Sequence, residues 1–292
     1  NNPLDINGTP LSQQINGIHP EWQAHPYQID FIKICRQNLL WTNAYATGLG
    51  KTSTALMVIQ DQHNLKLKNR TVFLVPKSTL SNWYKESLVG GNNKSAVYDP
   101  AIEDECIFIN LLEPSKYRTT KQSILKYNKA EGYKAGNFIV PPEYSDDPVY
   151  LLVLSLMNKN IDHYDYLSLP VDEQLKLVRD NVDIHNNPKQ YKKIFMSHQD
   201  FYRIRLKSDT AESYIKYLKL VDSDFAQSEF SESAGYSKRV ETLFNILHED
   251  GNGKNKCDLF LEDMNIDSLV ADEAHIFKNA VNPVKGNYDR VK

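Results

Sequence analysis

Two glycines, a lysine and a threonine stand together in the sequence "GLGKT", and these residue types suit phosphate binding. Gly48 and Gly50 have no Cβ, so the backbone can approach an anion closely, with several N–H groups directed at it. Lys51 adds a mobile positive charge for the β- and γ-phosphates of a nucleotide, and Thr52 offers a hydroxyl to Mg²⁺. An ordinary glycine turn before a helix is the alternative interpretation.

The residues around these glycines predict the strand, loop and helix that a phosphate-binding loop requires. The sequence "NLLWTNA" at residues 38–44 is typical of a short buried strand. Apolar residues at helical spacing follow the loop: Ala55, Leu56, Val58 and Ile59. The positive end of this helix would point at the phosphates. The loop departs from the pattern G-x-x-x-x-G-K-[ST] at one position, because Tyr45 stands where the first glycine belongs.

A pair of carboxylates near the end of the sequence supplies the other half of nucleotide chemistry. Asp272 and Glu273 open the sequence "DEAH", directly after the apolar run "SLVA". A carboxylate at the end of a strand can hold Mg²⁺ through water, and we assign this role to Asp272. The carboxylate that follows can orient the attacking water, and we assign this role to Glu273. By itself the pair has a simpler interpretation as an acidic cap of a surface helix. Together with the glycine loop, it favours nucleotide hydrolysis.

Buried strands and helices alternate along the chain, which predicts an α/β fold with a mostly parallel sheet and helices on both faces. Apolar runs typical of buried strands occupy residues 71–76, 106–110, 193–197 and 268–271. Helical patterns occupy residues 26–37, 171–182 and 237–249. Ligands of such sheets bind at the carboxyl ends of the strands. The glycine loop and the DEAH segment each follow a strand, so we expect them to meet at one edge of the sheet.

The composition allows a sizeable core and gives no sign of a membrane span or a signal peptide. The chain has 292 residues, of which 41% are hydrophobic and 24% charged, and its formal net charge is −3. Nucleic acid would therefore have to bind a local patch of positive charge. The longest apolar run, at residues 149–157, is too short to cross a membrane and predicts a core helix or strand. The widely spaced Cys35, Cys106 and Cys257 favour a reducing intracellular setting.

Five segments resemble, in the expected order, the motifs of the first motor lobe of the superfamily 2 helicases, and among these the SWI/SNF-type DNA translocases. They are "HPYQ", "GLGKT", "VFLVPKSTLSNWYKE", "KIFMSHQDF" and "LVADEAHIFKN". The resemblance implies a RecA-like P-loop NTPase fold that uses ATP and Mg²⁺. Residues 45–47 depart from it, because the family has Asp-Glu-Met at this place.

The resemblance also implies roles for single residues. Gln28 would contact adenine, and His275 would couple the ATP site to the next motif, with a core histidine as the alternative for His275. The nucleotide contacts that it implies are Gln28, Gly48, Leu49, Gly50, Lys51, Thr52 and Ser53. The catalytic residues that it implies are Lys51, Asp272, Glu273 and His275, with Thr52 and Asp272 as the Mg²⁺ ligands.

Contacts to a nucleic-acid backbone are implied at the ends of two strands. The residues concerned are Lys77, Ser78, Thr79, Ser197 and His198. An ordinary capped helix start, with Ser78 or Thr79 as the N-cap, is the alternative for the first three, since helix starts both need caps and bind phosphates. We predict Trp83 to be a core aromatic rather than a platform for base stacking. The tyrosine-rich stretch at residues 117–166 is predicted to form a satellite core, with binding of a partner or DNA as the alternative.

We expect a polar arm at residues 1–22 and an ATPase lobe at residues 23–292, with largely helical insertions near residues 90–190 and 205–256. Such insertions are similar to those of large phage- or plasmid-encoded helicase-like proteins, including anti-restriction ones. The resemblance implies an ATP-dependent motor that moves along or remodels duplex DNA or, alternatively, RNA. We expect it in the cytoplasm of a bacterial or phage-infected cell.

A second RecA-like lobe, in the same chain or in a partner, would complete the ATP site, so we expect residues 1–292 alone to be nearly inactive. Two other functions stay open from the sequence. One is the motor subunit of a restriction, anti-restriction or RNA helicase system. The other is a nucleotide-binding assembly protein without motor activity.

Overall fold

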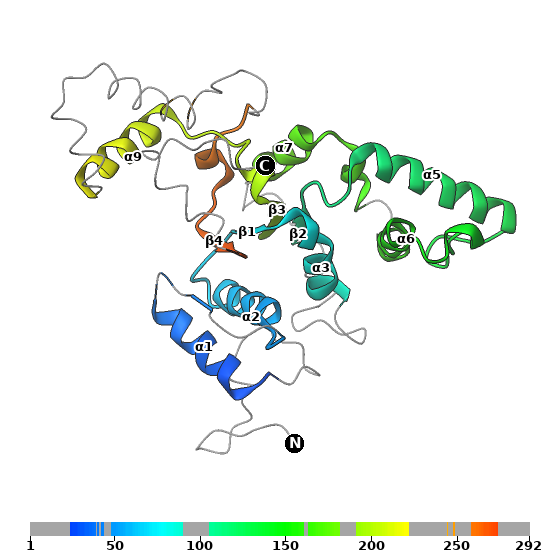
Figure 1. Cartoon of the computed structure of the whole chain (residues 1–292), viewed down its shortest axis with the longest axis horizontal. Coiled ribbons are helices and arrows are strands. Elements are labelled where there is room, and N and C mark those ends of the chain that lie inside the picture. Colours follow the sequence, from blue (N-terminus) through cyan, green and yellow to red (C-terminus); the bar gives the residue numbers. More distant parts are fainter. Residues whose placement is uncertain are drawn as a thin grey trace.

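The computed structural model describes residues 24–38, 40, 42–43, 48–89, 105–160, 163–181, 191–221, 244, 248 and 258–273. These residues form an α/β fold in which helices flank a four-stranded parallel sheet (Figure 1). The predicted α/β class and parallel sheet are confirmed, while the RecA-like assignment stays a prediction. None of the described helices combines the length and the apolarity that crossing a membrane requires.

The four strands of the sheet are β1 (Thr71–Val75), β2 (Cys106–Phe108), β3 (Lys193–Ser197) and β4 (Ser268–Ala271). Their order is β2-β3-β1-β4, so β3 and β1 have a neighbour on each side. Every residue of these two strands is buried, because a central parallel strand is covered on both faces, and this explains their apolar runs. All four strands lie within the segments predicted to be strands.

The register brings the carboxyl ends of three strands to one edge of the sheet. Val75 of β1 lies opposite Ser197 of β3, and Leu74 of β1 lies opposite Ala271 of β4. Because these strands are parallel, the segments that follow them all begin at this edge. We call it the carboxyl edge, and it is where ligands of parallel sheets bind.

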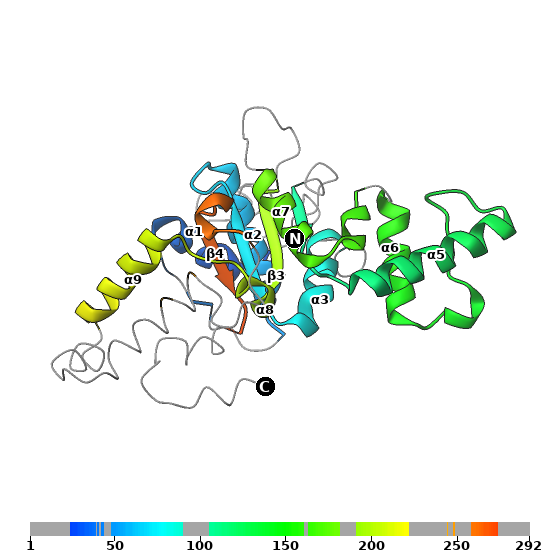
Figure 2. The same cartoon turned by 90° about the horizontal axis from the view of Figure 1, so that it is seen from above.

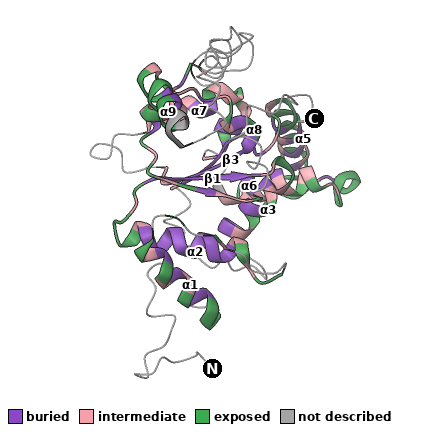
Figure 3. Ribbon diagram, turned by 60° about the vertical axis from the view of Figure 1, so that its left-hand side comes forward, coloured by how far each residue is buried: buried purple, intermediate pink, exposed green. Residues whose placement is uncertain are grey.

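One face of the sheet is covered by α2 (Lys51–Asn64), and α1 (Pro26–Gln37) packs on the outer side of α2 (Figures 1 and 3). Both helices were predicted, α1 with its proline at the first helical position. Arg36 joins them through a bidentate ion pair with Asp61, with both N–O distances at 2.7 Å. Because Asp61 is fully buried, this pair helps to fix the packing of α1 on α2.

An aromatic cluster lies next to α2, between the sheet and the helical segment that follows β1. This segment consists of the 3₁₀ turn η2 (Lys77–Thr79), α3 (Leu80–Tyr84) and the π-helical turn η3 (Lys85–Val89). The rings of Phe73 and Phe108 stack on either side of Phe195, with centroids 4.5 and 4.4 Å away. Trp83 packs against Phe73 and Phe195 and is buried. The prediction that Trp83 is a core aromatic is confirmed.

The opposite face of the sheet carries α7 (Val171–Asp180), with α8 (His198–Phe201) at the carboxyl edge and the turn η6 (Leu261–Met264) nearby (Figure 3). Arg70, just before β1, is buried and donates to the backbone carbonyls of Val178, Met264 and Asn181. Its guanidinium therefore holds α7 and η6 to the start of the central strand.

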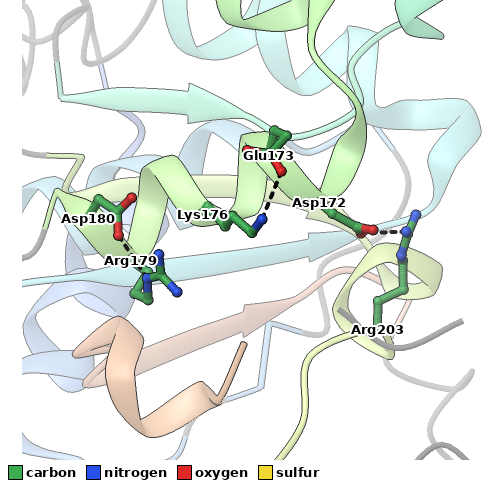
Figure 4. Close-up of polar contacts among 6 residues, drawn as sticks. All are labelled: Asp172, Glu173, Lys176, Arg179, Asp180 and Arg203. Atoms are coloured by element: carbon green, nitrogen blue, oxygen red, sulfur yellow. Dashed lines mark hydrogen bonds and ion pairs between the residues drawn. The ribbon is translucent and has the colours of Figure 1, made fainter. Parts of the chain in front are cut away.

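Ion pairs cover the outer surface of α7 (Figure 4). Lys176 pairs with Glu173, and Arg179 pairs with Asp180, each at 2.8 Å. Arg203, which follows α8, pairs with Asp172. Exposed pairs of this kind contribute little to stability, so α7 is held mainly by its buried apolar side and by Arg70.

The helices α5 (Pro114–Glu131) and α6 (Pro148–Asn160) pack on each other and project away from the sheet (Figures 1 and 2). Their base is a cluster of buried tyrosines, Tyr117, Tyr164 and Tyr166, next to the turn η5 (Asp165–Ser168). The Tyr166 hydroxyl accepts a 3.0 Å hydrogen bond from the Phe108 backbone N–H in β2. The tyrosine-rich stretch thus forms a satellite core in part, while Tyr133 and Tyr144, the latter in the turn η4 (Pro142–Tyr144), are exposed.

The insertions predicted near residues 90–190 and 205–256 stay a prediction. Strand β2 lies inside residues 90–190, so only part of that range projects as α5 and α6. At the second place, Arg205 donates its N–H to the Leu259 carbonyl and accepts from the Leu261 N–H, at 2.9 and 2.8 Å. The intervening chain, which begins with α9 (Ser208–Val221), therefore leaves and returns at one point.

One predicted strand is wrong. In residues 38–44, the described Asn38, Leu40, Thr42 and Asn43 belong to no strand, and Leu40 is 90% exposed. The segment directly follows α1, where the Asn38 side chain donates to the Ile34 carbonyl and ends the helix, so the short apolar run is drawn into a connection. Several predictions lie outside the described residues: the arm at residues 1–22, His275, Cys257 and most of the helix at 237–249. Neither Cys35 nor Cys106 forms a disulfide.

Candidate active site

The glycine loop enters α2 with backbone angles that favour glycine. Gly48 and Gly50 have φ values of +85° and +71°, in the left-handed region where a Cβ is strained. Gly50 directly precedes α2, and a Cβ there would stand 3.0 Å from the amide nitrogen of Gln28. A Cβ on Gly48 would meet nothing within 4 Å. Glycine is therefore required twice over at Gly50, by its backbone angle and by a close neighbour.

Gln28 ties the start of α1 to this loop. Its Oε1 accepts a 2.9 Å hydrogen bond from the His25 N–H, and its Nε2 donates to Thr54 Oγ1, also at 2.9 Å. Thr54 Oγ1 in turn donates to the Gly50 carbonyl at 2.8 Å. Gln28 is buried, so in this structure its amide positions the loop. The predicted contact of Gln28 with adenine stays a prediction.

The first turn of α2 presents features that suit an anion. Lys51 is exposed and Thr52 is partly exposed, at the positive end of a fourteen-residue helix. This turn contains no acidic residue, and no side chain caps it. Leu49 is exposed and its carbonyl accepts from the Tyr27 hydroxyl at 3.3 Å. Backbone N–H groups at such a helix start can bind phosphate.

Ser53 connects α2 to the helical segment after β1. It is buried and donates its hydroxyl to Glu86 Oε2 at 3.2 Å. Glu86 lies one helical turn after Trp83, in the π-helical turn η3. The sequence stretch "NWYKE" therefore reaches α2 with its glutamate, a contact that local pattern alone did not reveal.

Asp272 follows β4 at the carboxyl edge and is held there from several directions. Its N–H donates to the Leu74 carbonyl at 2.8 Å, which extends the pairing of β4 with β1. Trp83 Nε1 donates to Asp272 Oδ2, and the Glu273 N–H donates to Oδ1, both at 3.1 Å. His198 Nε2 donates to the Asp272 carbonyl at 3.1 Å, and burial lowers the pKa of this imidazole.

This arrangement leaves Asp272 able to hold a hydrated Mg²⁺. Each carboxylate oxygen has two lone pairs, and each accepts one of the hydrogen bonds described above. The remaining lone pairs suit the waters that Mg²⁺ usually keeps. Glu273 is exposed and has a φ of +53°, an uncommon angle for a residue with a Cβ. Strained angles of this kind are concentrated at functional sites.

The residues implied for nucleic-acid contact fall into two groups. Lys77 and Ser78 are exposed in η2 at the carboxyl edge, and the Lys77 ammonium donates to the Asn110 carbonyl. Thr79 stands at the N-cap position of α3, but its hydroxyl donates to the Pro76 carbonyl at 3.0 Å. Thr79 is therefore the N-cap residue of α3, as predicted, but its hydroxyl does not cap the helix, because the chain first makes a 3₁₀ turn.

Ser197 and His198 form the second group, and both are buried. Ser197 Oγ accepts from the Asp200 N–H at 3.0 Å and caps α8, and it also donates to Asp200 Oδ2 at 2.6 Å. Asp200 accepts from the Asn110 side chain at 3.1 Å. The structure thus uses these side chains to organise the carboxyl edge. Their contact with a nucleic acid stays a prediction.

The fold and the site together define an α/β protein with a parallel sheet, a glycine loop before α2 and an Asp-Glu pair at the carboxyl edge of the sheet. The chain is similar to a protein named "Defense against restriction protein B", from Escherichia phage P1. The two are 24% identical over 286 residues, which covers 96% of this chain but 11% of the phage protein. No model of a known protein family matches the chain, and no solved structure does.

Proposed function

We propose that these residues form the first RecA-like lobe of an ATP-dependent DNA translocase or helicase of the SWI/SNF type. The observation that carries the proposal is the fixed position of Asp272 at the carboxyl edge, where Trp83 and the Glu273 N–H each donate to one oxygen of its carboxylate. The left-handed Gly48 and Gly50 at the start of α2 support it, because they leave the backbone open to phosphate.

In the proposed site, the residues divide the work of phosphoryl transfer. Lys51 and the first N–H groups of α2 bind the phosphates of ATP, while Thr52 and Asp272 hold Mg²⁺. The metal, when bound, neutralises charge that develops on the β- and γ-phosphates. Glu273 orients the attacking water and accepts its proton. Gln28 contacts adenine. Alternatively, Gln28 keeps the loop in place through its hydrogen bond to Thr54, which in turn donates to the Gly50 carbonyl.

The remaining parts of the proposed motor come from outside this lobe. Arginines of a second RecA-like lobe stabilise the charge on the γ-phosphate, as arginine fingers do in other phosphoryl transfers. Duplex DNA contacts the lobe at the carboxyl edge, near Lys77, Ser78, Thr79, Ser197 and His198. Since η2 and α8 start there, backbone phosphates rather than bases would be bound.

The similarity to the phage P1 protein suggests the biological setting. We place the proposed motor in the cytoplasm of a phage-infected bacterial cell, with a role related to defence against restriction. Because the chain covers 11% of that phage protein, this role belongs to the proposal.

The test is an ATPase assay on the protein that carries this sequence, with and without duplex DNA. Wild type should show DNA-stimulated turnover, Lys51→Ala should weaken binding of a fluorescent ATP analogue, and Glu273→Gln should bind it normally yet lose turnover. Glu143→Gln, which removes an exposed carboxylate on η4, is the matched control and should behave as wild type. ATP binding without turnover in wild type would favour the nucleotide-binding assembly protein instead. Equal turnover in wild type and Glu273→Gln would refute the proposal.

A further inference from the structure

The outer face of α5 carries a continuous basic ridge. Arg118, Gln122, Lys126 and Lys129 follow one another at spacings of four, four and three residues, so they align along one side of the helix. All four are exposed. At about 1.5 Å per residue, the ridge is about 16 Å long. We call these four residues the α5 ridge.

The ridge is a local excess of positive charge in an acidic protein. Helix α5 contains five basic residues and one acidic residue, whereas the whole chain has a net charge of −3. Lys121 pairs with Asp165 of the turn η5. Among the residues that the structure describes, Arg118, Lys126 and Lys129 take part in no ion pair. Their charge is therefore available to a partner.

The one acidic side chain of α5 lies away from this face. Glu131 is exposed, and it follows the buried Ile124 by seven residues, so it falls on the side of the helix opposite the ridge. Asp147 is engaged at the start of α6, where its Oδ1 accepts from the Val149 N–H at 2.7 Å. The positive field of the ridge is thus not cancelled from its own helix.

The helix that carries the ridge is held in a fixed position. Tyr117, Ile124 and Asn128 are fully buried on its inner side. The Asn128 side chain donates to the Ile139 carbonyl at 2.7 Å and accepts from the Ile139 N–H at 2.8 Å, so it locks the end of α5 to the returning chain. A ligand of the ridge would meet a preformed surface, which lowers the entropy lost on binding.

We propose that the α5 ridge binds the phosphate backbone of duplex nucleic acid. The α5 ridge lies outside every motif used for the proposed motor. The proposal rests on the proposed function only in choosing DNA as the nucleic acid. A strand carries one phosphate per about 3.4 Å of axis, so a ridge of about 16 Å spans about five base steps. Three cations interspersed with polar side chains match such a row of phosphates.

The chemistry of this face favours nucleic acid over a membrane. Between Arg118 and Lys126 stands the exposed Gln122, whose amide can donate hydrogen bonds to phosphate oxygens. A helix that lies on a bilayer needs bulky apolar side chains next to its basic ones. On α5 no large apolar side chain is fully exposed, because Tyr117 and Ile124 are buried and Leu125 and Tyr127 are partly buried.

The test compares two triple variants with the same loss of charge, without nucleotide present. Arg118→Gln, Lys126→Gln and Lys129→Gln remove the ridge. Lys66→Gln, Lys176→Gln and Lys216→Gln remove three lysines outside α5. Equilibrium binding of a fluorescent DNA duplex is measured between about 50 and 200 mM salt. The ridge variant should lower the slope of log affinity against log salt by up to about 2.7, that is about 0.9 for each lost phosphate contact. The control triple should retain the wild-type slope.

Three results would overturn the proposal: no duplex binding by wild type at about 50 mM salt, equal slopes in wild type and the ridge variant, or equal losses in both triples. Preferential loss of binding to vesicles with anionic phosphatidylserine, with DNA binding unchanged, would also overturn it in favour of a membrane surface. Thermal unfolding checks that both triples fold.

The failure of this proposal can be told apart from the failure of the proposed motor. If the ridge variant keeps both its DNA affinity and its DNA-stimulated ATPase activity, the ridge proposal is refuted and the motor proposal is supported. If the protein does not hydrolyse ATP but the ridge variant loses DNA affinity, the motor proposal is refuted and the ridge proposal is supported.

Discussion

Two substitutions in the glycine loop look alike in the sequence but should differ in their effect on stability. Gly48 and Gly50 both have positive φ, so alanine at either position costs about 1–2 kcal/mol. Only at Gly50 does the new Cβ meet a neighbour, the Gln28 amide nitrogen at 3.0 Å. That nitrogen is not free to move, because Gln28 is buried and bonded to His25 and Thr54. Each of these bonds is worth about 0.5–1.5 kcal/mol. Gly50→Ala should therefore lower the free energy of unfolding by about 2–4 kcal/mol, against about 1–2 for Gly48→Ala.

Urea-induced unfolding followed by circular dichroism gives the free energy of unfolding for both variants and wild type. A double-mutant cycle with Gln28→Ala isolates the contact. Removing the Gln28 side chain should recover about 0.5–1.5 kcal/mol of the loss caused by Gly50→Ala, and none of the loss caused by Gly48→Ala. Equal losses at the two glycines, or no coupling between Gln28 and Gly50, would refute the argument that close packing adds to the requirement at Gly50.

Three further predictions concern buried or partly buried polar side chains. Trp83→Phe keeps a ring in the aromatic cluster but removes the hydrogen-bond donor to Asp272. In the proposed site, the Mg²⁺ concentration needed for half-maximal ATP binding should therefore rise about tenfold. An unchanged Mg²⁺ titration would contradict this prediction. Burial, with a smaller effect of nearby lysines, lowers the pKa of His63 from 6.5 to about 3, so below pH 6.5 the unfolded chain takes up a proton that the folded chain does not. Lowering the pH from 7 to 5 should therefore decrease the free energy of unfolding by up to about 2 kcal/mol, a dependence that His63→Gln should remove in urea titrations at both pH values. Arg70→Met removes the donors to three backbone carbonyls, so it should lower the free energy of unfolding by about 3 kcal/mol or more. The control Arg118→Met, on the exposed face of α5, should change the free energy of unfolding by less than about 0.5 kcal/mol.

The strands were predictable where burial alone decides the structure. The runs that became β1 and β3 are apolar because each strand is covered on both faces, and no other element accommodates such a run equally well. The run at residues 38–44 has a similar local composition, yet Leu40 is exposed and forms no strand. A local pattern reports that side chains are apolar, but it does not report whether a neighbouring strand is present to pair with them. That depends on the rest of the sheet.

The residues of the candidate site could be proposed from their types, but their contacts could not. The sequence indicates Asp272 and Gly50 because few other residues suit Mg²⁺ and phosphate binding at the end of a strand and the start of a helix. The bond from Trp83 to Asp272 joins residues 189 positions apart, and the Gln28 side chain reaches a threonine 26 positions away. Such contacts follow from the register of β1 with β4 and from the packing of α1 on α2, which no local window of sequence contains.

The contacts of Asp272 offer a physical link between the two functions of the proposed motor. Trp83 and His198 both bond to this one residue, and they stand in the segments that follow β1 and β3. These are the segments where we place nucleic acid, while Asp272 is where we place Mg²⁺. A nucleic acid that shifts α3 or α8 would therefore change the position of the Asp272 carboxylate without any relay through the sheet. Coupling of binding free energies is reciprocal, so a nucleotide that binds through Asp272 would change the affinity for nucleic acid by the same factor. The short path from Trp83 and His198 to Asp272 explains how a single edge of the sheet could serve both ligands.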